Sequence, residues 1–281
     1  MNRRQYPRIT LSALALFLFA ATAMLVSPAA SGQHEKRAAD EISQVLESFE
    51  TVTLDPAQVL RNVREDGAVT LQTGRGAFDL EVEPFDVRTD DYRSVAASGN
   101  GVMTELPRTP SNSWRGHVRG QENTFVRLYL DGQKVQGIII TPSQTFFVEP
   151  ARDLSKVAGA KEFLFYSAAD VRATDATCEE ATLGGKVAAE AARSGASVTS
   201  APKPDEAFAP KPEARVATEA DFEFYNRIVA LGGNEAATNN DILNIMTQVD
   251  GIYDAQLGVK IRVVFQRVWT TNTDPYTLTD A

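Results

Sequence analysis

Cysteine and histidine are almost absent from this sequence. The 281 residues contain one cysteine, Cys178, and two histidines, His34 and His117. One cysteine cannot form an intramolecular disulfide, and two histidines cannot supply a zinc site built on three. A Ser–His–Asp triad would have to use one of these two histidines. The sequence also has no HExxH, no CxxC and no glycine-rich phosphate loop between a strand and a helix.

The sequence also has fewer basic than acidic residues. Lys and Arg number 28 against 37 Asp and Glu, which gives a net charge of −9. A nucleic-acid-binding protein usually carries a basic face, so this balance argues against nucleic acid as a partner.

Only one long hydrophobic run occurs, and it lies at the N-terminus. Three arginines precede an apolar segment over 11–26, and small residues follow it up to Gly32. This pattern predicts a secretory signal peptide over 1–32, cleaved near Gly32. A membrane anchor is the alternative, but 16 residues fall short of the roughly 20 that a spanning helix needs. We therefore expect a secreted, extracellular product that has no membrane segment after cleavage.

Residues 33–178 have the pattern of a β-rich domain. A short helix is expected over 38–48, and strands follow at 52–54, 69–71 and 78–82, where apolar residues alternate with polar ones. The clearest hairpin covers 124–140, with Asp131-Gly132 supplying the positive φ of its turn. Further strands are expected at 144–148 and 163–166. The domain is therefore predicted to be antiparallel and rich in β-structure.

Residues 179–214 differ sharply in composition. Ala, Pro, Gly and Ser fill more than half of positions 181–214, and Phe208 is the single aromatic residue there. Such a segment buries too little apolar surface to offset its ordering entropy, so we expect a flexible linker. Arg193 within it and Arg215 at its end are the candidate sites of activating cleavage.

The remaining residues, 215–281, have an α/β pattern. Thr238 or Asn239 is expected to cap a long helix that ends near Leu257, before Gly258. A strand is expected over 259–269. The apolar stripe of the helix consists of Leu243, Met246, Val249, Ile252 and Tyr253. About 65 residues is little for an independent exported domain without disulfides, so this α/β unit is expected to be incomplete.

Two blocks resemble a known family. The first, from Trp114 to Pro150, resembles the propeptide core of reprolysin/adamalysin-type (ADAM-like) zinc metalloproteases. The second, from Ala220 onwards, is similar to the start of their catalytic domain. The matching positions are Gly116, Val118, Gly120, Gly132, Gly137, Ile139, Phe147, Val148, Glu149 and Pro150 in the first block, and Asp221, Phe224, Tyr225, Ile252, Tyr253, Trp269, Asp274, Pro275 and Tyr276 in the second.

This resemblance implies an α+β protein with an antiparallel β-rich propeptide, a flexible linker and an incomplete, metzincin-like α/β subdomain. It implies a secreted zinc metalloendopeptidase precursor, with its own catalytic domain as intramolecular partner and a protein or peptide as substrate. The family's HExxHxxGxxH motif is missing, so the resemblance implies truncation before the zinc site and a chain inactive alone. Cys178 matches the position of the latency cysteine that ligates zinc, although the family's Pro-Lys-x-Cys-Gly surroundings are absent.

Two other interpretations remain open at this point. The chain could be an exported, non-catalytic β-domain that binds a protein or a glycan. It could also be an independent hydrolase that uses His117, although no Ser/Asp arrangement stands out near this residue. Cys178 could equally be an incidental free thiol or pair with another chain.

Overall fold

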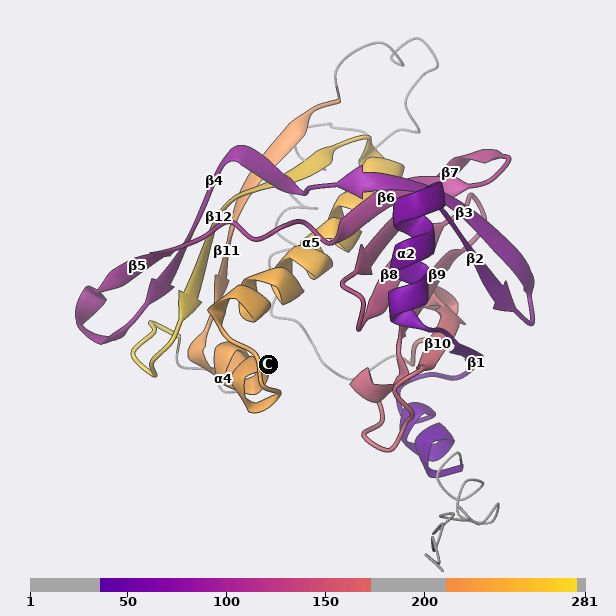
Figure 1. The fold of residues 1–281 in the computed structure, drawn as a ribbon, viewed down its shortest axis with the longest axis horizontal. Coiled ribbons are helices and arrows are strands. Elements are labelled where there is room, and N and C mark those ends of the chain that lie inside the picture. The colour runs from indigo at the N-terminus through magenta and orange to yellow at the C-terminus, as the bar shows by residue number, and fades with distance from the viewer. Residues whose placement is uncertain (1–35, 173–210, 277–281) are drawn as a thin grey trace, which may run out of the picture.

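The computed structural model describes residues 36–172 and 211–276 (Figure 1). The predicted signal peptide and all but the last residues of the predicted linker therefore lie outside the described residues. Within the described residues no helix has the length and apolar character needed to cross a bilayer.

An eight-stranded antiparallel sheet forms most of the N-terminal region. Its strand order is β1-β10-β9-β8-β7-β6-β3-β2, and it curls into a near-barrel. The Glu50 carboxylate accepts a hydrogen bond from the amide of Gly74 at 2.5 Å and pairs with Arg75, which links the two ends of the sheet. The strands are β1 (Glu50–Thr53), β2 (Ala68–Thr73), β3 (Gly76–Phe85), β6 (Ser113–Val118), β7 (Gln121–Leu130), β8 (Val135–Ile140), β9 (Thr145–Pro150) and β10 (Glu162–Ser167).

The interior of this near-barrel is apolar. Strand residues alternate between the interior and the outer face, as the period-2 pattern predicts. Helix α2 (Pro56–Asp66) adds its own buried side chains to this core; it begins at the N-cap Asp55 and ends at Gly67, whose φ is 63°. Sequence analysis did not predict α2. The core includes Val59, Leu60, Val63, Leu71, Leu80, Val126, Leu128, Leu130, Ile139, Val148, Phe163 and Phe165.

The predicted hairpin is confirmed. β7 and β8 pair from Phe125↔Ile140 to Leu130↔Val135, which leaves a four-residue loop. Gly132 adopts a φ of 88°, as expected. The Asp131 carboxylate accepts hydrogen bonds from the backbone amides of Gln133 and Lys134.

A second sheet joins the two halves of the sequence. Its order is β11-β12-β4-β5, formed by β11 (Glu213–Ala220), β12 (Lys260–Trp269), β4 (Arg88–Ala97) and β5 (Met103–Leu106). β12 runs parallel to both β11 and β4. Two expectations need correction here. β4 leaves the antiparallel sheet and pairs with β12 of the C-terminal segment, with β5 on its other side. Glu213 and Ala214 belong to a strand rather than to a linker.

Two helices connect β11 to β12. α4 (Phe222–Ala230) begins at the N-cap Asp221, and α5 (Glu235–Leu257) lies between the four-stranded sheet and strands β7 and β8 (Figure 1). Gly258 ends α5 with a φ of 64°, as predicted, but the cap at its start is Asn234, not Thr238 or Asn239.

The predicted apolar stripe of α5 is confirmed only in part. Leu243 is buried in an apolar cluster and Met246 packs against that cluster. Val249 and Ile252 are only partly buried, and Tyr253 is 43% exposed. The buried face is mostly polar or small, because α5 packs against charged and hydroxyl-bearing side chains. That face consists of Thr238, Asn239, Leu243, Asn244, Thr247, Asp250 and Gly251.

Candidate functional site

A buried ion cluster joins the near-barrel to α5. Arg127 on β7 has a side chain that is only 4% exposed. Its Nε donates to an Asp250 oxygen at 2.9 Å, and its Nη2 donates to Asp254 at 3.0 Å. The other Asp250 oxygen accepts a hydrogen bond from the amide of Ile261 at 3.0 Å. Lys211 also binds Asp254. One cation from the N-terminal region is thus neutralised entirely by the C-terminal segment.

A glycine in α5 leaves the space that the Arg127 side chain occupies in this cluster. A Cβ atom on Gly251 would lie 2.6 Å from Cγ of Arg127, so a glycine at this turn of α5 lets the arginine pass. The guanidinium lies 5.3 Å from the centre of the Phe85 ring, and Arg115 and Arg262 contact the same ring. These cation–π contacts replace part of the hydration that burial removes from Arg127.

Further polar pairs extend along the interface. Ser113 Oγ lies 2.8 Å from Thr247 Oγ1, and Asn244 donates to the Gln136 side chain at 2.7 Å. A buried polar group is costly unless it is hydrogen-bonded, so these matched partners hold α5 in one position against β6 and β8.

The four-stranded sheet carries a second ionic group near the first residues of its parallel strands. Arg88 is 5% exposed and makes two hydrogen bonds to the Asp86 carboxylate, at 2.8 and 2.9 Å. Burial alone would raise the pKa of Asp86, but the hydrogen bonds from Arg88 and Arg108 lower it below its ordinary value. A pocket of about 570 Å³ opens here and is lined by equal numbers of arginines and acidic residues, so it presents no net charge.

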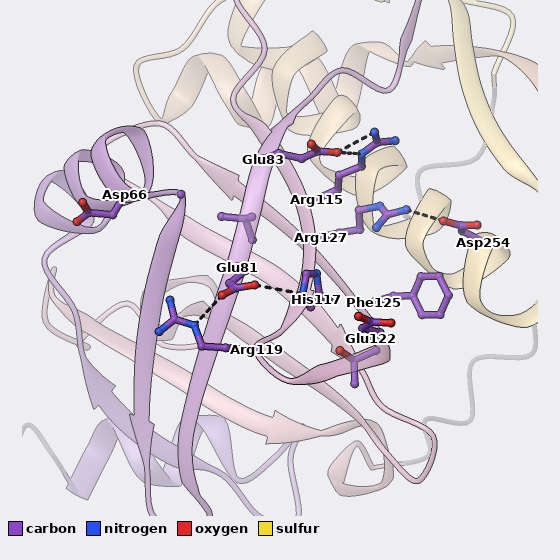
Figure 2. Close-up of a pocket in the computed structure, with 14 residues that line it drawn as sticks. Asp66, Glu81, Glu83, Arg115, His117, Arg119, Glu122, Phe125, Arg127 and Asp254 are labelled. Atoms are coloured by element: carbon purple, nitrogen blue, oxygen red, sulfur yellow. Dashed lines mark hydrogen bonds and ion pairs between the residues drawn. The ribbon is translucent and has the colours of Figure 1, made fainter.

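An open groove of about 630 Å³ lies over β3, β6 and the start of β7 (Figure 2). His117 Nε2 is 3.2 Å from the Glu81 carboxylate, which also pairs with Arg119 at 2.7 Å. Two residues further along β3, Glu83 pairs with Arg115 at 2.8 Å. The residues of the Glu81–His117 and Glu83–Arg115 pairs lie directly opposite each other in the antiparallel β3–β6 ladder, which is why their side chains meet.

This groove has no catalytic constellation around His117. Among the residues that line it, only Thr124 carries a hydroxyl, which donates to the Gln121 carbonyl and accepts from the Val118 amide and is therefore held in the turn. The arrangement can bind charged groups, and nothing in it activates a nucleophile.

The structure separates the residues that sequence analysis singled out. Arg215 lies within β11, pairs with Asp91 at 2.7 Å and is therefore part of a folded strand rather than of a linker. Gly32, Cys178 and Arg193 lie outside the described residues. Across 36–172 and 211–276, no group of three His, Cys, Asp or Glu side chains is placed to hold a metal ion. The described residues therefore do not form a zinc site.

Sequence reasoning missed the Arg127 cluster. A signal was available, because Arg127 lies among the apolar residues of the strand TFVRLYL and Asp250-Gly251 lies among the apolar residues of the helix. Each is unusual alone, but only the fold brings residues 127 and 250 together.

The chain matches no model of a known protein family and no curated protein.

Proposed function

We propose that residues 36–172 act as a propeptide that assists the folding of the C-terminal segment and keeps it latent, in a precursor of a secreted metalloendopeptidase. The observation that carries this proposal is the shared sheet: β4 of the N-terminal region pairs in parallel with β12 from Val263 to Trp269. The resemblance of the two sequence blocks supplies the protease class, and the predicted signal peptide supplies export.

The C-terminal segment has little means of folding alone. It contributes two strands, β11 and β12, and a two-stranded sheet is at best marginally stable in water. Its long helix would also expose Asp250, which is 2% exposed when Arg127 is present. β4, β5 and Arg127 supply what this segment lacks, which is the behaviour expected of a folding template.

A refolding experiment tests this proposal. We would dilute denatured 211–281 into buffer alone, with 33–172, or with 33–172 carrying Arg127→Glu, and follow α5 by circular dichroism and amide exchange. Helix formation and slow exchange are expected only with the unaltered N-terminal region, because the variant places a third acid beside Asp250 and Asp254. Equal protection of 211–281 alone would contradict the proposal.

The zinc and Cys178 parts of the proposal depend on the resemblance alone. The 33–281 product should not hydrolyse casein, with or without added zinc, because its two histidines cannot form the family's site. In a precursor that also carries HExxHxxGxxH, Cys178→Ser should release activity before any cleavage if this thiol maintains latency. Equal latency in both precursors would assign the inhibition to steric cover.

The charged groove of Figure 2 favours a second candidate, the exported binding domain. Its alternating acids and arginines suit charged side chains of a polypeptide better than a neutral glycan. Labelled Lys-rich and Glu-rich peptides, titrated against wild type and Glu81→Gln, test this candidate by fluorescence anisotropy. Saturable binding of one peptide, weakened by the substitution, is the expected result for this candidate, and its absence for both would exclude it.

A further inference from the structure

The pocket at the start of the four-stranded sheet, which we call the Asp86 pocket, receives guanidinium groups from three segments of the chain. Arg88 lies on β4, Arg108 follows β5, and Arg262 lies on β12. Arg88 and Arg108 donate to the same oxygen of the Asp86 carboxylate, each at 2.9 Å. Arg262 approaches the Asp86 backbone carbonyl at 3.4 Å. One carboxylate therefore lies among three cations.

The buried side of this pocket has one more positive charge than its ion pairs neutralise. Asp86 balances the charge of either Arg88 or Arg108, but not of both. Glu213 lies 3.7 Å from Arg262, which is an ion pair without a hydrogen bond. The side chains of Arg88 and Arg262 are only 2% and 16% exposed, so water screens this excess charge weakly.

Hydrogen-bond donors are also left over on the buried side. A guanidinium carries five N–H donors. Arg88 uses Nε and Nη2 for Asp86 and the Thr109 carbonyl, and its Nη1 donates to no group in residues 36–172 and 211–276. An excess positive charge with unused donors favours a carboxylate or phosphate oxygen as partner.

The exposed side of the same pocket has the opposite excess. Arg215 and Asp91 neutralise each other at 2.7 Å. Asp90 also lines the pocket, is exposed, and forms no ion pair within the described part of the chain. The lining therefore sums to zero charge but is polarised, with one unmatched cation at its buried side and one unmatched acid at its exposed side.

The spacing of these two charges limits the size of a ligand. Arg88 and Asp90 are two residues apart on β4, so strand alternation places them on one face, about 7 Å apart along the backbone. An extended peptide of two residues spans at most about 7 Å. In a single amino acid the ammonium and carboxylate groups are attached to the same carbon, and they cannot span this distance. The pocket volume of about 570 Å³ is ordinary for a small ligand.

We propose that the Asp86 pocket binds a dipeptide as its zwitterion. The carboxylate lies among Arg88, Arg108 and Arg262, and the ammonium group lies at Asp90. A phosphate or nucleotide would bring two or more negative charges towards Asp90, Asp91 and Glu213, whereas a polyamine would meet the guanidinium groups. The site does not depend on the proposed folding role of the N-terminal region.

Isothermal titration calorimetry of the 33–281 product with alanylalanine tests the proposal. We expect saturable binding with a Kd of about 1 mM or tighter. N-acetyl-alanylalanine lacks the ammonium group and alanylalanine amide lacks the carboxylate, so each should bind at least about tenfold more weakly. Free alanine and inorganic phosphate should also bind at least about tenfold more weakly, for reasons of span and of charge.

Two substitutions address the two ends of the ligand separately. Asp90→Asn should weaken alanylalanine at least about fivefold but should not weaken N-acetyl-alanylalanine, because only the former has an ammonium group. Arg262→Met should weaken both peptides. Asp90 is exposed, so its substitution keeps the fold intact even if Arg262→Met does not. Arg93→Met is the matched control, since Arg93 lies on the same strand, is 66% exposed and pairs with Glu105 outside the pocket.

The proposal is supported if alanylalanine binds best of these probes and only the pocket substitutions weaken it. Absence of saturable alanylalanine binding would overturn it. Equal affinity for N-acetyl-alanylalanine, tighter binding of phosphate, or no effect of Asp90→Asn would make the pocket a simple anion site, which also overturns the choice of a zwitterion.

Discussion

The near-barrel interior and the α5 interface are both buried, but they are built from opposite kinds of side chain. The interior packs aliphatic and aromatic residues, such as Leu80 and Leu128, at no more than 1% exposure. The interface packs Arg127, Asp250 and Thr247 at comparable burial. Apolar packing tolerates small shifts, whereas paired charges and hydrogen bonds require one relative position. The near-barrel therefore supplies stability, and the interface specifies where the C-terminal segment sits.

The strongest challenge to this comparison is removal of the buried cation. Arg127→Met should lower the free energy of unfolding by about 3–5 kcal/mol, because Asp250 keeps its charge and loses its partner. Urea denaturation measures this loss. Arg119→Met is the matched control: its pair with Glu81 is exposed, so the change should stay within about 1 kcal/mol. Similar losses for both variants would mean that the cluster does not specify the interface.

Replacing the whole ion pair separates specificity from stability. Arg127→Met combined with Asp250→Leu should recover part of the lost stability, because no uncompensated charge stays buried. Recovery should be incomplete, since the Ile261 amide loses the Asp250 oxygen that it donates to. A double variant less stable than Arg127→Met alone would contradict this reasoning.

Two glycines, one in the near-barrel wall and one in the α5 interface, allow the packing of these two regions to be compared. A Cβ atom on Gly116, in the near-barrel wall, would lie 1.8 Å from the Glu81 carbonyl oxygen, and one on Gly251 would lie 2.6 Å from Cγ of Arg127. Alanine at either position should cost about 1–3 kcal/mol, the larger loss falling at Gly116, where backbone must move. Gly99→Ala, which meets nothing nearer than 3.9 Å, should stay within about 0.5 kcal/mol. Thermal denaturation of the three variants checks this order.

Much of the near-barrel was predictable from sequence, because period-2 alternation and turn glycines are local signals. The β7–β8 hairpin and the end of α5 at Gly258 follow from residues that lie close together in the chain. Helix α2 also has a local signal, because Asp55-Pro56 is typical of a helix start and Gly67 of a helix end.

The pairing of β4 with β12 was not predictable in the same way. β4 carries Arg88, Asp90 and Asp91, and nothing local indicates that it leaves one sheet for another. The α5 stripe is confirmed only at Leu243 and Met246 for a related reason: apolar spacing predicts a buried face only where the neighbouring surface is apolar, and part of that surface carries Arg127. The candidate site depends on these long-range choices, so it was not found from sequence.

The smallest expected effects are two changes in the free energy of unfolding with pH, which have opposite signs. Burial raises the pKa of Glu149, on β9, although Tyr166 donates a hydrogen bond to it at 2.8 Å. A raised carboxyl pKa stabilises the fold at low pH, and this contribution is lost as pH rises through the folded-state pKa. The lowered pKa of Asp86 acts in reverse: its contribution is present at neutral pH and is lost as pH falls through the folded-state pKa.

Free energies of unfolding, measured between about pH 3 and pH 7, test these signs. Glu149→Gln should remove part of the decline seen on raising the pH, and Asp86→Asn part of the decline seen on lowering it. If the two substitutions had the reverse effects, or gave identical pH profiles, the pKa of Glu149 would not be set by burial and that of Asp86 would not be set by its arginine partners.

The central claim is that residues 36–172 and 211–276 are held together by a shared sheet and a buried ion cluster, rather than by chain continuity alone. Its most direct test is a specific protease site inserted between residues 181 and 200, cut to completion in native 33–281 and analysed by size-exclusion chromatography. The account predicts that the two fragments elute together, at the volume of the uncut protein, and separate only in denaturant. Separation of the fragments in native buffer would contradict it.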